Sequence, residues 1–338
     1  MRESITVASA TLVLLLALAG CGGGGGASPN STPLPPPPPS PAPAPTPTPT
    51  PAQVIKPETL TIGTNAQTVA YTVYETDTLS SESNVSGSKD LAKFIKSVPS
   101  EQGATIQLDF DEARQIYKIK LPTGEAGELT DLGLNGSAGQ IASSTFHRIS
   151  SNGETVGSVW MPVPFRERYP YTYSHYGRWY KSEGNADGTH TKIYGWFVYG
   201  YQPAADAIPR SGTATYRAEI FGETPVDAFE ISGTVKLAFD FGSGTLSGSM
   251  NPFLYTNGWY TDLDYDYGVY DFAQTVYSVG SANYSGKFSK DGVLLDASWF
   301  DGSLTGPNAQ EVIGRFSAPF TRDGTQGTMT GVWIGKKD

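Results

Sequence analysis

The sequence predicts an all-β protein, in which a small β-rich module precedes an antiparallel β-barrel of eight or nine strands. Three observations support this fold class. Apolar and aromatic residues alternate with polar ones in short runs, which is the two-residue period of a strand. Clusters of Gly, Asn, Asp, Ser and Pro, which favour tight turns, separate these runs. Of the 338 residues, 39 are glycine and 12% are aromatic, a composition typical of strands that bend and pack closely.

Residues 1–20 predict a lipoprotein signal peptide. The apolar run over 7–20 is shorter than the roughly 20 apolar residues that a membrane-spanning helix needs, and it suits the apolar region of a secretory signal. Leu18-Ala19-Gly20-Cys21 ends the run and resembles the bacterial lipobox, in which the cysteine carries the lipid. Cys21 is the only cysteine, so no intramolecular disulfide can form. The alternative is an ordinary signal peptide that leaves a free thiol.

Residues 21–52 predict a disordered tether behind the lipidated Cys21. Five glycines (22–26) precede a proline-rich stretch over 33–51. Such a stretch favours the extended polyproline II conformation, which advances about 3.1 Å per residue. We therefore expect the tether to hold the folded part away from the membrane. A proline-rich recognition segment is the alternative interpretation.

Residues 53–164 predict a modest β-rich, handle-like module. Val69–Tyr74, Ile106–Phe110 and Tyr117–Leu121 alternate as strands do. Between the first two runs, Ser88–Lys96 has apolar residues at helical spacing after a serine cap, which predicts a short helix.

Residues 165–338 predict the barrel domain. Tyr169, Tyr171 and Tyr173 stand two apart and would share one face of a strand. Many short strands joined by tight turns favour a barrel, because closure removes the unpaired sheet edges. The expected strands are Tyr169–Lys181, Tyr194–Tyr201, Thr213–Gly222, Phe229–Phe241, Thr245–Asn251, Ala282–Phe288, Leu294–Leu304, Val312–Phe320 and Thr328–Gly335.

Charge and motifs argue against nucleic-acid binding and against catalysis. The formal net charge is -10, whereas nucleic-acid affinity comes mainly from Lys and Arg that neutralise phosphates. The sequence contains no nucleophile elbow, zinc-protease helix or phosphate-binding loop motif. His147, His175 and His190 are far apart in sequence, so no histidine-based catalytic arrangement is indicated. We expect a protein that is not an enzyme and that needs no cofactor.

The segment over 257–272, NGWYTDLDYDYGVYDF, is the strongest candidate for ligand binding. Its aspartates recur at every second residue, which places them on one face of an extended chain and the intervening residues on the other. A calcium loop fits poorly, because Gly268 comes one position late and Ala273 stands where a ligating Glu is expected. A protein-recognition surface of tyrosines and carboxylates and a merely solvated hairpin both remain open. The candidate ligand-binding residues are Trp259, Tyr260, Asp262, Asp264, Tyr265, Asp266, Tyr267 and Tyr270.

A haem site is a further alternative, at residues 169–176. This stretch contains both tyrosine and histidine, which are side chains that can ligate haem iron.

Four internal phrases and the C-terminal segment resemble transferrin-binding protein B-like barrel lipoproteins, whose relatives include factor H-binding protein. The phrases are Tyr176–Trp179, Pro209–Tyr216, Val235–Gly244 and Gly306–Glu311, and the C-terminal segment closes with Gly-Val-Trp-Ile-Gly-Lys-Lys at 331–337. The resemblance covers roughly the last half of the chain. It implies a surface lipoprotein with a C-terminal barrel whose loops bind a ligand, in a family that includes binders of transferrin, of haem-carrying proteins and of complement regulators. This chain has one barrel signature and no duplicate, unlike the two-lobed transferrin binders.

Together these observations predict a non-enzymatic binding lipoprotein anchored to the outer membrane by its N-terminal lipid and exposed at the cell surface. The expected ligand is a host or environmental macromolecule, or an iron- or haem-bearing one, and the resemblance implies handover to an outer-membrane transporter. The alternative is a structural envelope lipoprotein without a soluble ligand.

Overall fold

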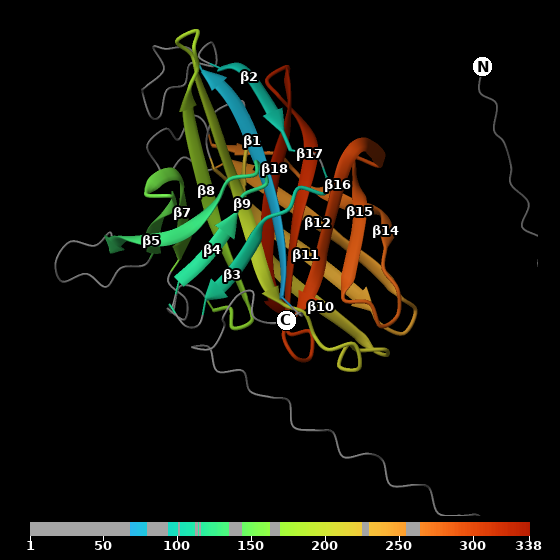
Figure 1. Cartoon of the computed structure of the whole chain (residues 1–338). Coiled ribbons are helices and arrows are strands. Elements are labelled where there is room, and N and C mark those ends of the chain that lie inside the picture. Colours follow the sequence, from blue (N-terminus) through green and yellow to red (C-terminus); the bar gives the residue numbers. More distant parts are fainter. Residues whose placement is uncertain are drawn as a thin grey trace, which may run out of the picture. The chain divides into compact units, whose positions relative to one another are not determined.

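The structure is a computed structural model in which every described regular element is a strand (Figure 1). It describes residues 68–79, 94–100, 102–111, 114, 116–134, 144–162, 170–224, 230–254 and 264–338. The expected all-β class is confirmed. The signal peptide, Cys21 and the tether lie outside these residues. No helix in the described part of the chain is long and apolar enough to cross a membrane.

The first sheet has nine antiparallel strands in the order β2-β1-β9-β8-β7-β6-β5-β4-β3. Its core consists of apolar side chains such as Ile149, Val159 and Trp179, which are fully buried. The strands are β1 Thr68–Leu79, β2 Phe94–Pro99, β3 Gln107–Asp111, β4 Ile116–Lys120, β5 Ala126–Leu134, β6 Ser144–Ser151, β7 Glu154–Pro162, β8 Ser174–Gly184 and β9 His190–Tyr201.

The second sheet closes into an eight-stranded barrel, because β11 pairs with both β10 and β12. The predicted barrel is thereby confirmed. A ninth element, the two-residue β13, pairs with the end of β12 outside the closed ring. The strands are β10 Thr213–Glu223, β11 Glu230–Asp240, β12 Thr245–Leu254, β13 Tyr265–Asp266, β14 Tyr270–Val276, β15 Asn283–Lys290, β16 Val293–Thr305, β17 Glu311–Arg322 and β18 Thr325–Lys337.

Two expectations about single elements were wrong. The expected barrel strands at Tyr169–Lys181 and Tyr194–Tyr201 correspond to β8 and β9, which lie in the first sheet, so the second sheet begins at Thr213. The reason is that β9 pairs along its whole length with β1, a partner too distant in sequence for a local pattern to reveal.

The second correction concerns the expected helix over Ser88–Lys96. Its last residues, Phe94–Lys96, belong to β2, where pairing with β1 overrides helical spacing. Residues 88–93 are outside the described part.

Aromatic rings in mutual contact occupy the barrel interior. Phe288, Phe300, Phe316 and Trp333 are all fully buried, and the ring of Phe316 stacks 5.9 Å from that of Trp333. The indole N–H of Trp333 donates to the hydroxyl of Tyr284 at 2.9 Å. Because these side chains fill the space between the strands, the barrel is a packed core rather than a container.

An apolar layer joins the two sheets. It combines β1, β8 and β9 of the first sheet with β17 and β18 of the barrel, and Figure 1 shows β1, in blue, passing beside β17 and β18. Trp196 and Val198 on one side meet Ile313, Val332 and Ile334 on the other, all nearly or fully buried. This contact buries apolar surface on both partners, so it stabilises one arrangement of the two sheets.

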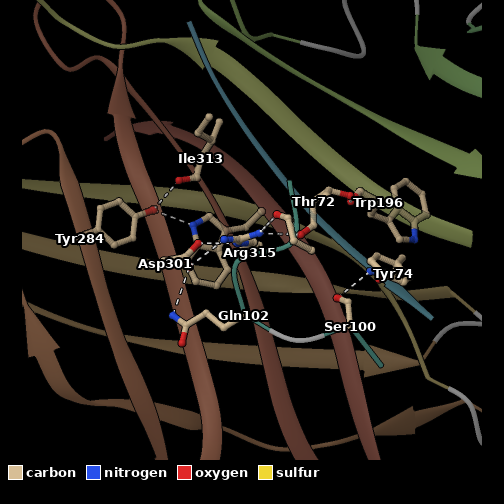
Figure 2. Close-up of polar contacts among 11 residues, drawn as sticks. Thr72, Tyr74, Ser100, Gln102, Trp196, Tyr284, Asp301, Ile313 and Arg315 are labelled. Carbon is tan, nitrogen blue, oxygen red and sulfur yellow. Dashed lines mark hydrogen bonds and ion pairs between the residues drawn. The ribbon is translucent and has the colours of Figure 1, made fainter. Parts of the chain in front are cut away.

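Arg315 on β17 is the polar centre of this junction (Figure 2). Its guanidinium donates to both carboxylate oxygens of Asp301, at 2.7 and 3.2 Å. It also donates to the carbonyl oxygen of Thr72 in β1, at 3.0 Å, and to that of Ala104. The rings of Tyr71 and Trp299 lie 5.5 and 5.7 Å from the guanidinium carbon. One barrel side chain thus binds the first sheet at two backbone positions.

Glu311, at the start of β17, makes a second polar link across the junction. Its carboxylate accepts hydrogen bonds from the backbone N–H groups of Thr172 and Tyr173, at 2.6 and 3.0 Å. Burial raises the pKa of Glu311, and the two N–H groups oppose this rise because they favour the charged form. Nearby, the hydroxyl of Tyr171 donates to the carbonyl of Ile334 at 3.1 Å.

Candidate functional site: the acidic rim of the barrel

The described part of the acidic aromatic segment lies at one end of the barrel. Tyr265 pairs with Leu254 and Asp266 pairs with Phe253, so the segment lies beside the end of β12. The β15–β16 turn at Asp291 and the β17–β18 turn at Asp323 lie at the same end. We call the carboxylates of Asp264, Asp266, Asp291 and Asp323 the acidic rim. Trp259, Tyr260 and Asp262 of the predicted site lie outside the described residues.

The three described tyrosines of the segment turn toward the barrel. Tyr267 and Tyr270 are 2% and 0% exposed. The ring of Tyr267 meets that of Phe320 edge-on at 5.0 Å, and the hydroxyl of Tyr270 donates to the carbonyl of Pro319 at 3.2 Å. Tyr265 packs edge-on against Tyr267, also at 5.0 Å. In this conformation the tyrosines anchor the segment, and Asp266 is exposed.

Two cations of this barrel end hold the anchor in place. The ammonium of Lys290 donates to the carbonyl of Tyr267 at 2.7 Å and lies 4.8 Å from the ring centre of Tyr270. The guanidinium carbon of Arg322, an 8% exposed side chain, lies 5.0 Å from the ring centre of Tyr265. Cation–π contacts of this kind are worth roughly 0.5–2 kcal/mol, depending on burial. Arg322 also pairs with Asp323 of the acidic rim, with 3.7 Å between its Nε and Oδ2, so the negative charge of the rim is partly compensated at that residue.

A hollow of ≈ 610 Å³ lies beside the anchor. Its wall includes Lys290, Asp291, Leu295 and Phe320, together with the first residues of β18 (326–328). Exposed Val269 and Val293 lie at the same barrel end. The rim therefore combines negative charge with accessible apolar surface, which is what a docking surface for a partly basic partner requires.

One of the aspartates considered as a metal ligand already accepts a hydrogen bond from the backbone. The Oδ1 atom of Asp266 accepts a hydrogen bond from the N–H of Gly268 at 2.8 Å, within a local turn where Gly268 has φ +74°. Across the described ranges, no group of three His, Cys, Asp or Glu side chains is placed to hold a metal ion. Asp264 and Asp266 are among the residues covered by this statement, whereas Asp262 lies outside the described residues.

The described residues of the haem candidate are engaged in packing. The hydroxyl of Tyr171 donates to a backbone carbonyl, and burial raises the pKa of this phenol. Tyr176 stacks on Phe221 at 4.0 Å, and His175 stacks on Tyr199 at 5.5 Å. A tyrosine ligand of haem iron binds best as phenolate, so the environment of Tyr171 opposes that role. Tyr169 lies outside the described residues.

Sequence reasoning missed the contribution of Lys290, Arg322 and Phe320 to this site. Lys290 reaches the segment through the pairing of β14 with β15, and Phe320 reaches it from β17, more than 50 residues further along the chain. One available signal was that each cation directly precedes an Asp-Gly turn, at Asp291-Gly292 and at Asp323-Gly324, where hairpin ends gather at one rim.

No protein-family model and no curated protein matches the sequence. Among solved structures, the chain is similar to a double mutant of transferrin-binding protein B from Haemophilus parasuis, with 15% identity over 80% of this chain and 45% of that chain, at a TM-score of 0.39. It is similar to isotype 1 transferrin-binding protein B from serogroup B Neisseria meningitidis, with 16% identity over 79% and 43%, at 0.33. A third structure is a surface lipoprotein, with 12% identity over 69% and 97%, at 0.30. The chain spans about half the length of the transferrin-binding protein B structures. Two of the three structures are transferrin-binding protein B, after which the group that the sequence motifs resemble is named.

Proposed function

We propose that the chain is an exported, non-enzymatic binding lipoprotein, anchored in the outer membrane through Cys21 and exposed at the cell surface. Its acidic rim captures a macromolecular ligand, or an iron- or haem-bearing one, and passes it to an outer-membrane transporter. The observation that carries this proposal is the filled barrel. Since aromatic rings occupy the interior, a ligand is bound outside it, and the rim offers charge, a hollow and exposed valines together.

The anchor is tested by replacing Cys21 with serine. A serine hydroxyl cannot take the thioether-linked diacylglycerol, so we expect the variant to lose incorporated palmitate and to move from the membrane fraction to the soluble fraction. Radiolabelled palmitate incorporation and detergent phase partitioning measure this change. Protease treatment of intact cells that produce the unaltered chain then measures exposure. Palmitate incorporation by Cys21→Ser, or full protection of the unaltered chain from protease, would contradict the corresponding part of the proposal.

The rim is tested by changing Asp262, Asp264 and Asp266 together to asparagine. Removing three negative charges lowers attraction to a basic partner, so we expect binding to weaken by at least about tenfold at low ionic strength and less at high salt. Isothermal titration of the compact unit Pro51–Asp338 against haem, calcium and candidate iron-carrying proteins measures the affinity.

A matched control removes three exposed carboxylates elsewhere, Asp109, Asp206 and Asp338, and should leave binding within about twofold, because distant exposed charges are screened. Equal weakening by both triple variants would argue for a net-charge effect rather than a rim site. No heat with any of these ligands would favour the structural envelope lipoprotein.

A further inference from the structure

A second hollow lies where the first sheet meets the barrel, at the opposite end of the barrel strands from the acidic rim. It measures ≈ 480 Å³, within the range of about 300–1,000 Å³ that is typical of small-molecule sites. Tyr71 lies on β1 and Gln102 in a turn between β2 and β3, whereas Asn283, Ser285 and Asp301 come from the barrel. We call it the junction cleft. Interfaces between packed units are frequent places for such sites, because neither unit alone closes them.

The wall of the junction cleft is held in one geometry. The amide nitrogen of Gln102 donates to Oδ2 of Asp301 at 3.3 Å, and both oxygens of Asp301 accept from Arg315 (Figure 2). The amide of Gln202 donates to Oδ1 of Asn283 at 2.7 Å, which fixes the orientation of that side chain. Pre-set walls lower the ordering cost of binding.

The junction cleft carries little net charge. Asp301 is its one carboxylate among the described lining residues, and the bidentate contact with Arg315 neutralises it. Burial raises the pKa of the Tyr71 phenol to about 12, so this group stays a neutral hydroxyl. An anion would find no unoccupied cation here, and a metal ion would have to compete with Arg315 for the carboxylate.

Polar atoms of the lining residues remain available to a ligand. The carbonyl oxygen of Gln102, the amide nitrogen of Asn283 and the hydroxyls of Ser278 and Ser285 form no hydrogen bond with another described residue. This set contains donors, acceptors and groups that are both. Apolar surface accompanies it, since Val276 is 63% exposed and also lines the cleft.

We propose that the junction cleft binds a neutral polyhydroxylated ligand, an oligosaccharide of a few sugar units. Sugar hydroxyls both donate and accept hydrogen bonds, as the amides and serine hydroxyls of the cleft do, and the C–H faces of a sugar ring match Val276 and the edge of Tyr71. The uncompensated charge that would select an anionic or cationic ligand is missing from the described wall. This site is independent of the acidic rim and of the ligand proposed there.

The test titrates the full chain, purified in a detergent without a sugar headgroup, with neutral maltotriose, cellotriose and chitotriose. Saturation-transfer NMR and calorimetry report binding. We expect at least one of the three to bind. Ser285→Trp, which fills the cleft, and Gln102→Ala, which removes one polar partner, should each weaken that binding by at least about tenfold, as expected for blocking the site or for losing a hydrogen bond that the bound ligand would enclose.

Ser247→Trp is the matched control. Ser247 is exposed on β12, outside the lining of the cleft, so its replacement should leave the affinity unchanged. Urea unfolding of each variant establishes that the fold is retained, and Gln102→Ala carries the test if Ser285→Trp fails to fold. Absence of binding by all three trisaccharides, undiminished binding by Gln102→Ala, or tighter binding of trigalacturonic acid than of the neutral sugars would each overturn the proposal. The triple aspartate variant of the rim should bind the trisaccharide with unchanged affinity. The proposal for the junction cleft can therefore be refuted without refuting the proposal for the acidic rim, and the reverse.

Discussion

Replacing Arg315 with methionine is expected to lower the free energy of unfolding by about 3–5 kcal/mol, the usual cost of removing one partner from a buried ion pair. The side chain of Arg315 is 8% exposed and that of Asp301 is 18% exposed, so water replaces the lost contacts poorly. The change also removes the donor to the carbonyls of Thr72 and Ala104. Urea unfolding followed by the fluorescence of the six tryptophans measures the loss.

Three further variants separate the causes. Arg315→Lys keeps the charge but loses the planar fork, so an intermediate loss is expected. The double change Arg315→Met with Asp301→Leu removes both charges and should recover most of the stability, because well-packed apolar residues often replace a buried pair without loss. Arg217 pairs with Asp338 in solvent, with 75% of its side chain exposed, so Arg217→Met should cost under about 1 kcal/mol. A loss for Arg315→Met no larger than that for Arg217→Met would show that Arg315 does not stabilise the junction.

The C-terminal hairpin could be predicted from the sequence because its signals are local. Alternating apolar residues predict strands over Val312–Phe320 and Thr328–Gly335, and both lie within the paired strands β17 and β18. The turn between them follows from Asp323-Gly324, and both residues have positive φ, 49° and 80°. Asn, Asp and Gly tolerate this conformation, which matches the twist of the adjoining strands.

The junction could not be predicted because its partners are distant in the chain. Arg315 donates to Thr72, 243 positions away, and β1 pairs with β9, which is more than 100 positions further along the chain. A two-residue period reports which side chains share a face and leaves open what covers that face. One local hint exists, since Arg315 is the one charged residue in the run Val312–Phe320, which is otherwise apolar or small. A single arginine in such a run is usually paired.

The orientation of the acidic segment depended on the same kind of information. Alternation correctly separates exposed Asp266 from buried Tyr267, but it leaves open which set faces a ligand. The tyrosines face the barrel because they contact Phe320, Lys290 and Arg322, which are distant in sequence. Asp266 is consequently the described aspartate of the predicted site that is exposed, and a steering role for its charge fits better than direct contact by the rings.

Replacing Trp333 with alanine is expected to lower the free energy of unfolding by about 3–5 kcal/mol, as for other large-to-small changes in a core. Trp333 is fully buried, stacks on Phe316 and donates to Tyr284. Its indole also covers Gly314 on the neighbouring strand, where a Cβ atom would lie 2.5 Å from the ring. The indole of Trp333 therefore leaves no room for a side chain at position 314. We expect the effects of substitutions at these two positions on stability to be coupled.

Gly314→Ala measures this coupling. In the unaltered chain the added methyl group should cost about 1–3 kcal/mol through overpacking, whereas in the Trp333→Ala background it enters the vacated space and should cost little. The expected coupling energy is at least about 1 kcal/mol, as for residues in direct contact. Gly184→Ala on β8 is the control, because a Cβ there would lie 3.8 Å from the ring of His190, an ordinary contact. Urea unfolding of the four variants completes the cycle. If the two losses in the free energy of unfolding are strictly additive, the neighbouring strands can shift to accept the extra methyl group. Contact with Trp333 would then not be the reason for glycine at position 314.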